Sequence, residues 1–438
     1  MTISVIWPCA RRRRIIMINS RPERGRARGR GYDVPGPLDG VRVLEVASYV
    51  FVPAAGAILA DWGADVLKVE HPGSGDPSRN TAAWGVPADV QGFAHIFELN
   101  NRGKRAIGLD VATPQGRDVL MEIVDGIDVF LTNLLPAARQ KLGIEPDDIW
   151  ARNPSVVYGR GTAQGPRGPA AGKGGFDGIT YWGRSGAAIG ATLPGQEYPS
   201  PMPGPGFGDL QSGMAMAGGI GTALFQRERT GRGVLVDVSL MSTGLWAMGL
   251  TVSGASLLGV DDLPHQGHFA SPNPLTNTYR TRDGHFIALG FLQADRYWPE
   301  FCLTVDRLEW LADERFMTAD DRRDNAEACV RMLDQLFVER TLAEWEEVLS
   351  RQSGQWDVFL PAGRIRYDEQ VLANDFAQEI ENDQGGKVVL VPAPAQFDGV
   401  VTKIRNAPKL GADTDDVLRQ LGRSDEAIAQ LRSAGVVA

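Results

Sequence analysis

The stretch VRVLEVASYVFVPAAGAILADWGADVLKVE, residues 41–70, decides the fold. Its apolar runs at 41–47 and 64–70 predict two buried strands, and the segment from Pro53 to Gly63 between them has the spacing of a helix. Two strands joined by one helix in so short a span predict a parallel pair with a right-handed crossover.

The same alternation continues along the chain. Thr113 and Pro114 are placed to cap and open a helix with an apolar stripe, and further strands are predicted at 105–111, 128–133 and 155–161. The pattern predicts an α/β protein with a Rossmann-like parallel sheet. Ligands of such sheets bind at the carboxyl ends of the strands, which here carry Ser48–Phe51, His71, Asp110 and Asn133.

Composition narrows the class of protein. The 438 residues suffice for two or three domains. The first 30 residues hold nine Arg and one Glu, a balance of +8, so the net charge of −9 leaves −17 for the remainder. So acidic a body argues against nucleic-acid binding. Three scattered Cys fit a reducing, cytoplasmic setting, and no apolar run reaches the ~18 residues of a membrane span.

Several familiar site motifs are missing from the sequence. It has no G-x-G-x-x-G, no P-loop, no H-E-x-x-H and no G-x-S-x-G elbow. The few Cys and His show no metal-ligand spacing, so we expect no metal site and no tightly bound cofactor. These absences argue against most classes of hydrolase, against zinc proteases and against nucleoside triphosphatases.

A series of longer motifs resembles the class III CoA-transferases, the family of formyl-CoA transferase and of the carnitine and bile-acid CoA-transferases. The motifs, which together span about residues 37–435, are PLDGVRVLEVASYVFVPAAGAILADWGADVLKVEHPGSGDPSR, LNNRGKRAIGLDV, DVFLTNLLPAARQKLG, GFGDLQSGM, ERTGRGVLVDVSL and APKLGADTDDVLRQLG. The resemblance implies coenzyme A and acyl-CoA as substrates, a free carboxylic acid as the second substrate, and an interlocked homodimer as the assembly.

The resemblance also implies a domain division. We expect a large Rossmann-like domain and a smaller α+β domain: the large CoA-binding domain at 37–225, a helical linker at 226–262, the small domain at 263–365, and a return segment at 366–438 that completes the large domain. Residues 1–36, which are basic and low in complexity, are predicted to be a disordered arm.

The family's nucleophile is the Asp of a Gly-Asp pair, which matches Gly208 and Asp209 ahead of a Gly/Ala-rich helix. A carboxylate can attack a thioester to form a mixed anhydride and can then hold CoA as an aspartyl thioester. A helix N-terminus favours the ionised form that such a nucleophile needs. By residue type alone, Asp209 could equally be a helix cap.

Asp177 is a second, supporting acidic candidate. Related acyl-CoA racemases carry His directly before this acid, whereas Phe176 stands here. Without that His, racemisation lacks its second proton carrier. An acyl-CoA racemase or isomerase on the same fold, or a CoA-binding protein without catalysis, nevertheless remains an alternative.

The resemblance also implies contacts to CoA. The matching positions are Val50, Phe51, His71, Leu109, Asn133, Leu134 and Lys141. Lys141 is the candidate partner of a phosphate, and His71 stands where many members have Arg. Arg102, Lys104 and Arg105 form a second cationic cluster, either near CoA or at a surface strand entry. The family members that act on oxalate carry a run of glycines, and this sequence lacks it. Its absence favours a larger aryl-, hydroxy- or branched acid as the second substrate.

Overall fold

The computed structural model describes residues 36–83, 85–263 and 267–438. Residues 1–35 of the expected basic arm lie outside the described residues. A six-stranded parallel sheet runs in the order β3-β2-β1-β4-β5-β6. Its strands are β1 (Arg42–Val46), β2 (Asp65–Glu70), β3 (Arg105–Gly108), β4 (Val129–Thr132), β5 (Val157–Thr162) and β6 (Leu235–Ser239). The parallel, Rossmann-like sheet predicted from the sequence is therefore confirmed.

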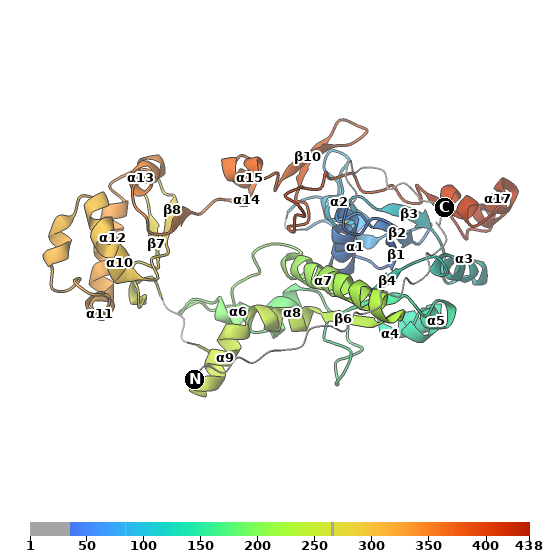
Figure 1. Ribbon diagram of the computed structural model, residues 1–438, viewed down its shortest axis with the longest axis horizontal. Helices are drawn as coiled ribbons and strands as arrows, with labels where there is room; N and C mark the ends of the chain where they lie inside the picture. The colour runs from blue at the N-terminus through green and yellow to red at the C-terminus, as the bar shows by residue number, and fades with distance from the viewer. Residues whose placement is uncertain (1–35, 84, 264–266) are drawn as a thin grey trace, which may run out of the picture.

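Helices cover both faces of this sheet (Figure 1). On one face lie α1 (Phe51–Asp61) and α7 (Phe207–Thr230), whose side chains share a buried cluster with β1, β4 and β5. On the other lie α3 (Pro114–Val124), α5 (Pro146–Arg152), α16 (Thr414–Gln420) and α17 (Asp425–Ser433). The short helices α2 (His95–Asn101) and α4 (Pro136–Leu142) follow β2 and β4.

The glycines of α7 allow it to lie directly against α1. A Cβ added at Gly213 would stand 2.8 Å from the Cβ of Ala54 and 2.9 Å from the main-chain oxygen of Phe51. Glycine is otherwise unfavourable inside a helix. This close approach places the first turn of α7 beside the turn that joins β1 to α1.

The C-terminal segment contacts the edge strand β3. The main-chain NH of Ala106 donates to the carboxylate of Asp413 at 2.9 Å, and the NH of Gly108 donates to the Thr414 hydroxyl at 3.1 Å. Thr113 caps α3 as its sequence predicts, and Ser424 caps α17. Helix α16 begins at Thr414 and follows the N-cap Asp413.

One element differs from the sequence-based expectation. Residues 235–239, inside the segment expected to be a helical linker, form β6 and pair with β5 at the edge of the sheet. Only the later part of that segment is helical, as α8 (Leu240–Ala247) and α9 (Gly249–Leu258). The β-branched run VLVDVS favours a strand because an open sheet edge is available to pair with it.

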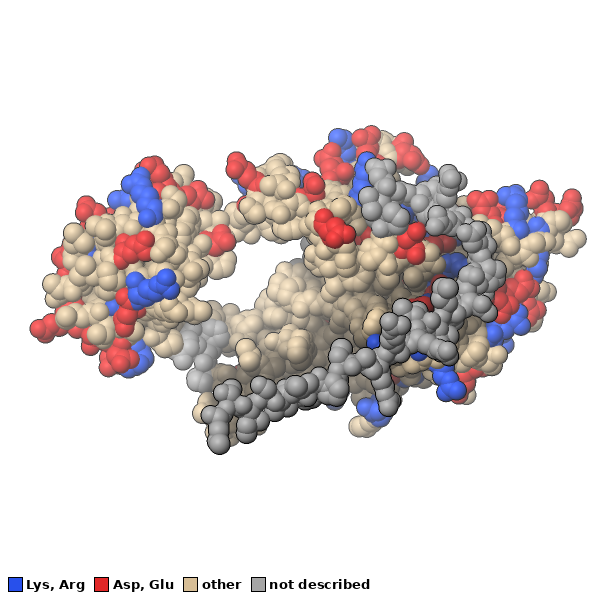
Figure 2. Space-filling view, viewed as in Figure 1, with Lys and Arg blue, Asp and Glu red and all other residues tan. Residues whose placement is uncertain are grey.

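A smaller lobe is built around a three-stranded antiparallel sheet, β7 (Thr278–Arg280), β8 (Phe286–Leu289) and β9 (Trp356–Val358). Its core is closed by α10 (Ala294–Thr304), α12 (Ala326–Phe337) and α13 (Leu342–Leu349), with α11 (Ala319–Asp324) beside them. The chain returns through α14 (Ala362–Ile365), α15 (Glu369–Ala373) and the hairpin β10 (Gln378–Glu381) and β11 (Lys387–Leu390). Figure 2 shows an opening between this lobe and the rest of the molecule.

Within the described part of the chain, no helix is long and apolar enough to cross a membrane. The same residues contain no group of three or more His, Cys, Asp or Glu side chains arranged to hold a metal ion.

Candidate functional site

Two neighbouring cavities open at the carboxyl ends of the parallel strands. The larger, of about 470 Å³, contains Asp209 and four of the predicted contact residues, Val50, Phe51, Asn133 and Leu134. The smaller, of about 230 Å³, is lined by His71, Leu109 and Leu134. Ser48 and Leu134 line both cavities, so a long ligand could pass from one to the other. The structure thus gathers six of the seven predicted contact positions around one continuous recess.

Asp209 lies in the first turn of α7, and its residue is only 8% exposed. The helix is entered through Gly206, which has a left-handed backbone with φ of 72°. Gly208 is required for space, because an added Cβ would lie 2.4 Å from the Tyr181 ring. The Gly-Asp pair therefore presents the carboxylate to the larger cavity while Tyr181 packs closely against the main chain beside it.

Burial raises the pKa of Asp209 to about 8, and the nearby Asp177 carboxylate adds to the rise. In the free protein, burial of Asp209 therefore outweighs the stabilisation of its ionised form that was expected from the helix N-terminus. Removal from water destabilises a charge more than the N-terminal dipole, worth typically 0.3–1 kcal/mol, stabilises it.

Asp177 holds the entry to α7 in place. Its Oδ2 accepts a hydrogen bond from the main-chain NH of Gly208 at 3.1 Å, and its Oδ1 accepts one from the NH of Gly178 at 2.8 Å. Asp177 thereby caps the start of the π-helical segment Gly178–Arg184 and binds the residue preceding Asp209. Sequence reasoning left its role open, and these contacts make it an anchor of the Gly-Asp pair.

The predicted contact residues differ in how they are held. Asn133 holds the β1–α1 turn through two hydrogen bonds to Ser48. Its Oδ1 accepts from the main-chain NH of Ser48 at 3.0 Å, and its Nδ2 donates to the main-chain oxygen of Ser48 at 2.7 Å. His71 is exposed, and its Nδ1 accepts from the main-chain NH groups of Gly73 and Ser74. Asn133 therefore shapes the recess, whereas His71 lies at its rim.

Two cations line the larger cavity, Arg139 and Lys173, and sequence reasoning missed both. Lys141 is exposed and is not among the residues that line either cavity. Arg139 is two positions earlier on α4, so it points to roughly the opposite side of the helix. It is buried, and its Nη1 donates to the Leu134 oxygen at 2.6 Å while its Nε lies 3.2 Å from Glu145.

The second cationic cluster serves the fold. Arg102 pairs with Asp61 at 2.6 Å, Lys104 with Glu45 at 2.7 Å, and Arg105 with Asp65 at 2.9 Å. Arg102 and Lys104 are buried and line neither cavity. They therefore occupy neither of the two expected places, a site near CoA or an exposed strand entry.

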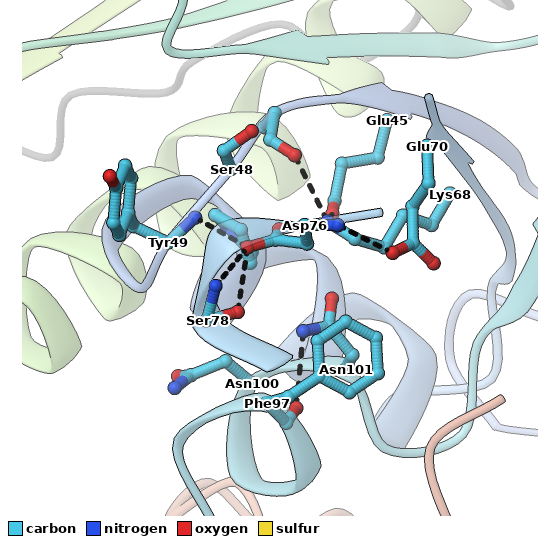
Figure 3. A network of polar contacts seen from close by, with 12 residues as sticks. Glu45, Ser48, Tyr49, Lys68, Glu70, Asp76, Ser78, Phe97, Asn100 and Asn101 are labelled. Atoms are coloured by element: carbon cyan, nitrogen blue, oxygen red, sulfur yellow. Dashed lines mark hydrogen bonds and ion pairs between the residues drawn. The ribbon is translucent and has the colours of Figure 1, made fainter. Parts of the chain in front are cut away.

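Beneath the β1–α1 turn lies a buried ion network, also missed by sequence reasoning (Figure 3). The Nζ of Lys68 lies 3.1 Å from Glu45 and 2.8 Å from Asp76, and all three residues are at most 2% exposed. A signal was present: Glu45 and Lys68 interrupt two apolar runs, and they are register partners in β1 and β2.

Comparison with known proteins agrees with this site. Residues 38–414 match the profile of CoA-transferase family III. The (R)-2-hydroxy-4-methylpentanoate CoA-transferase of Clostridioides difficile is 31% identical over 91% of this chain and 99% of its own length. The cinnamoyl-CoA:phenyllactate CoA-transferase of Clostridium sporogenes is 29% identical, over 90% and 95%.

A solved structure agrees as well. The crystal structure of a CAIB/BAIF family protein from Brucella suis superposes with a TM-score of 0.75 at 27% identity, covering 89% of this chain and 100% of the other. The family profile spans most of the sequence and the fold matches along its length, so this protein belongs to CoA-transferase family III.

Proposed function

We propose that the protein transfers coenzyme A from an acyl-CoA to a free carboxylic acid, with Asp209 as the covalent nucleophile. The observation that carries this is the placement of the carboxylate. Asp209 stands in the first turn of α7, faces the 470 Å³ cavity at the strand ends, and follows a glycine whose side-chain space is taken by Tyr181. The curated relatives are CoA-transferases, so the racemase alternative is not favoured.

The chemistry proceeds in two symmetric halves. A carboxylate oxygen of Asp209 attacks the acyl carbon, the C–S bond breaks, and a mixed anhydride forms with CoA thiolate as the leaving group. The thiolate then attacks the Asp209 carbonyl, releasing the first carboxylate and leaving an aspartyl-CoA thioester. The acceptor carboxylate attacks that thioester, and the thiolate returns to the acceptor's acyl carbon, which regenerates Asp209. No water or redox partner is consumed.

The first turn of α7 can stabilise the oxyanion of these steps. The NH of Gly208 donates to Asp177 and the NH of Leu210 donates to the Gly206 oxygen. Among the described residues, the NH groups of Phe207 and Asp209 have no acceptor, so they remain available to a developing negative charge.

The acceptor we propose is an aryl-, hydroxy- or branched acid. The cavity wall near Asp209 is apolar, formed in part by Phe176, Ile179 and Leu240. The names of two relatives specify 2-hydroxy-4-methylpentanoate and phenyllactate, which are acids of this kind. Such walls favour the bulk of an apolar side chain over a small dicarboxylate.

Mass spectrometry of the protein after incubation with a panel of acyl-CoAs tests the proposal. Rapid quenching and borohydride reduction should tag one peptide at Asp209, and acceptor acid added before the quench should lower the amount of tag. A tag elsewhere, or acyl-CoA turnover with no adduct at all, contradicts the covalent route.

The pH dependence of transfer should report the raised pKa of Asp209. Only the ionised carboxylate attacks, so below about pH 8 the rate should fall about tenfold per pH unit. Asp177→Asn removes a neighbouring negative charge, so the acid limb should move to lower pH. Asp237→Asn, whose carboxylate pairs with Arg160 on the sheet edge, serves as the control and should leave the limb in place. An unmoved limb in Asp177→Asn contradicts the coupling of the two carboxylates.

We also propose an interlocked homodimer. Trp246, Leu250 and Leu257 on α8 and α9 are 88%, 91% and 88% exposed, an apolar surface that is unusual for a monomer. In the view shared by Figures 1 and 2, α8 lies below the opening, through which part of a second subunit could pass. Light scattering should give twice the chain mass, and Leu250→Glu should weaken the dimer whereas Leu303→Glu on the smaller lobe should not. A stable and active wild-type monomer contradicts the assembly.

A further inference from the structure

The turn between β1 and α1 has an unusual backbone. Tyr49 has φ of 66°, in the left-handed region that non-glycine residues avoid. Side chains from distant parts of the chain hold the turn: Asn133 binds both main-chain groups of Ser48, and Asp76 Oδ1 accepts the NH of Tyr49 at 3.2 Å. A strained conformation persists only where surrounding structure imposes it, and Asp76 supplies one of these restraints.

Asp76 is itself firmly fixed (Figure 3). Besides the Tyr49 NH, its Oδ1 accepts the main-chain NH of Ser78 at 2.8 Å and the Ser78 hydroxyl at 2.7 Å, and its Oδ2 faces Lys68 at 2.8 Å. Lys68 also donates to the Ala47 oxygen at 2.9 Å, on the same turn. Burial opposes ionisation of Asp76, but the Lys68 charge and the Ser78 hydrogen bonds hold the pKa of Asp76 below its usual value.

Tyr49 connects this network to the larger cavity. Its ring meets the Phe176 ring edge to face, with centroids 5.5 Å apart, and both residues line the cavity that contains Asp209. The two rings are partly exposed, with Tyr49 at 40% and Phe176 at 58%, so the main chain has to hold the aromatic pair in place. Asp76 also lines the smaller cavity, so the residue that holds the Tyr49 turn belongs to the neighbouring part of the recess.

We propose that Asp76 is a positioning residue for CoA transfer: it holds Tyr49 in its left-handed turn and thereby fixes the Tyr49–Phe176 wall beside Asp209. The inference rests on the proposed function, because it assigns a role in that reaction. No other charged group accepts the Tyr49 NH in the described chain. Loss of Asp76 should release the turn, let Tyr49 relax toward negative φ, and misplace the reacting groups.

A double-mutant cycle between Asp76 and Tyr49 tests the proposal. Asp76→Ala should lower kcat/KM by about 10–100-fold, mainly through kcat, as expected for misplaced reacting groups. Glycine takes φ near 66° without strain, so in a Tyr49→Gly background the same substitution should cost less than about threefold. Asp65→Ala is the matched control, because Asp65 lies on β2, pairs with Arg105 and lines neither cavity; kcat and KM should not change.

Amide hydrogen exchange supplies a readout that does not depend on activity. The peptide spanning residues 47–52 should exchange faster in Asp76→Ala than in wild type or Asp65→Ala. If Asp76→Ala does not fold, Asp76→Asn replaces it in the cycle and should show a smaller loss with the same dependence on Tyr49. Equal losses in both backgrounds, or faster exchange with unchanged kcat/KM, overturn the positioning role. A wild-type protein that transfers no CoA overturns the proposed function itself.

Discussion

Asp209→Ala is expected to reduce CoA transfer by about 10⁴-fold or more, the range seen when a covalent nucleophile is removed. No substitute nucleophile is evident, because Asp177 is committed to the NH groups of Gly178 and Gly208. Steady-state rates with a saturating acyl-CoA and acid measure the loss, and CoA binding measured separately should be largely kept. Asp128→Ala, which removes the partner of Arg227 at the far end of α7, is the matched control.

The same position should show a trade-off between stability and activity. Because the pKa of Asp209 is raised in the folded chain, the folded state binds more protons than the unfolded state between about pH 4 and 8. Stability contributed by this site is therefore present at low pH and is lost as pH rises through about 8. Asp209→Asn should melt at a higher temperature than wild type at pH 8, with little difference near pH 4.

For the activity prediction, an Asp209→Ala protein that keeps a tenth of wild-type CoA transfer would falsify the mechanism.

Glu45→Ala is expected to lower the free energy of unfolding by about 3–5 kcal/mol, the cost of breaking a buried ion pair. Glu45 Oε1 faces Lys68 and Oε2 faces Lys104, and all three side chains are fully buried. The substitution leaves the buried charges of Lys68 and Lys104 with less compensation. Urea titration of the purified protein measures the change.

The loss of unfolding free energy in Glu45→Ala should depend on pH. Burial lowers the pKa of Lys104 to about 8 even with Glu45 present. Without Glu45 the pKa should fall further, so the destabilisation should shrink as pH rises toward 9 and Lys104 loses its charge. Glu379→Ala is the surface control: its partner Lys387 and Glu379 are both 56% exposed, and about 0–1 kcal/mol is expected. A Glu45→Ala protein as stable as this control contradicts the account.

Local sequence was sufficient for β1 to β5 and for the capped helix α3, but not for β6. The alternation of apolar strands and helices depends on residues within one turn or one strand, so 41–47 and 64–70 predicted β1 and β2 without tertiary information. The longer motifs indicated the family, which the comparisons confirmed. The parallel crossovers also follow from the β-α-β alternation, whereas the strand order β3-β2-β1-β4-β5-β6 is known only from the structure.

Tertiary structure decided what surrounds the site. Which of Arg139 and Lys141 faces the cavity depends on the rotation of α4 against the sheet, and the raised pKa of Asp209 depends on how deeply α7 buries its first turn. Asp76 reaches Tyr49 across 27 positions of sequence. Sequence by itself determined the alternation of strands and helices, because that is a property of neighbouring residues, and the family motifs supplied the candidate nucleophile. Burial and charge pairing arise only when segments far apart in the chain meet, so the structure alone decided the network and the protonation of Asp209.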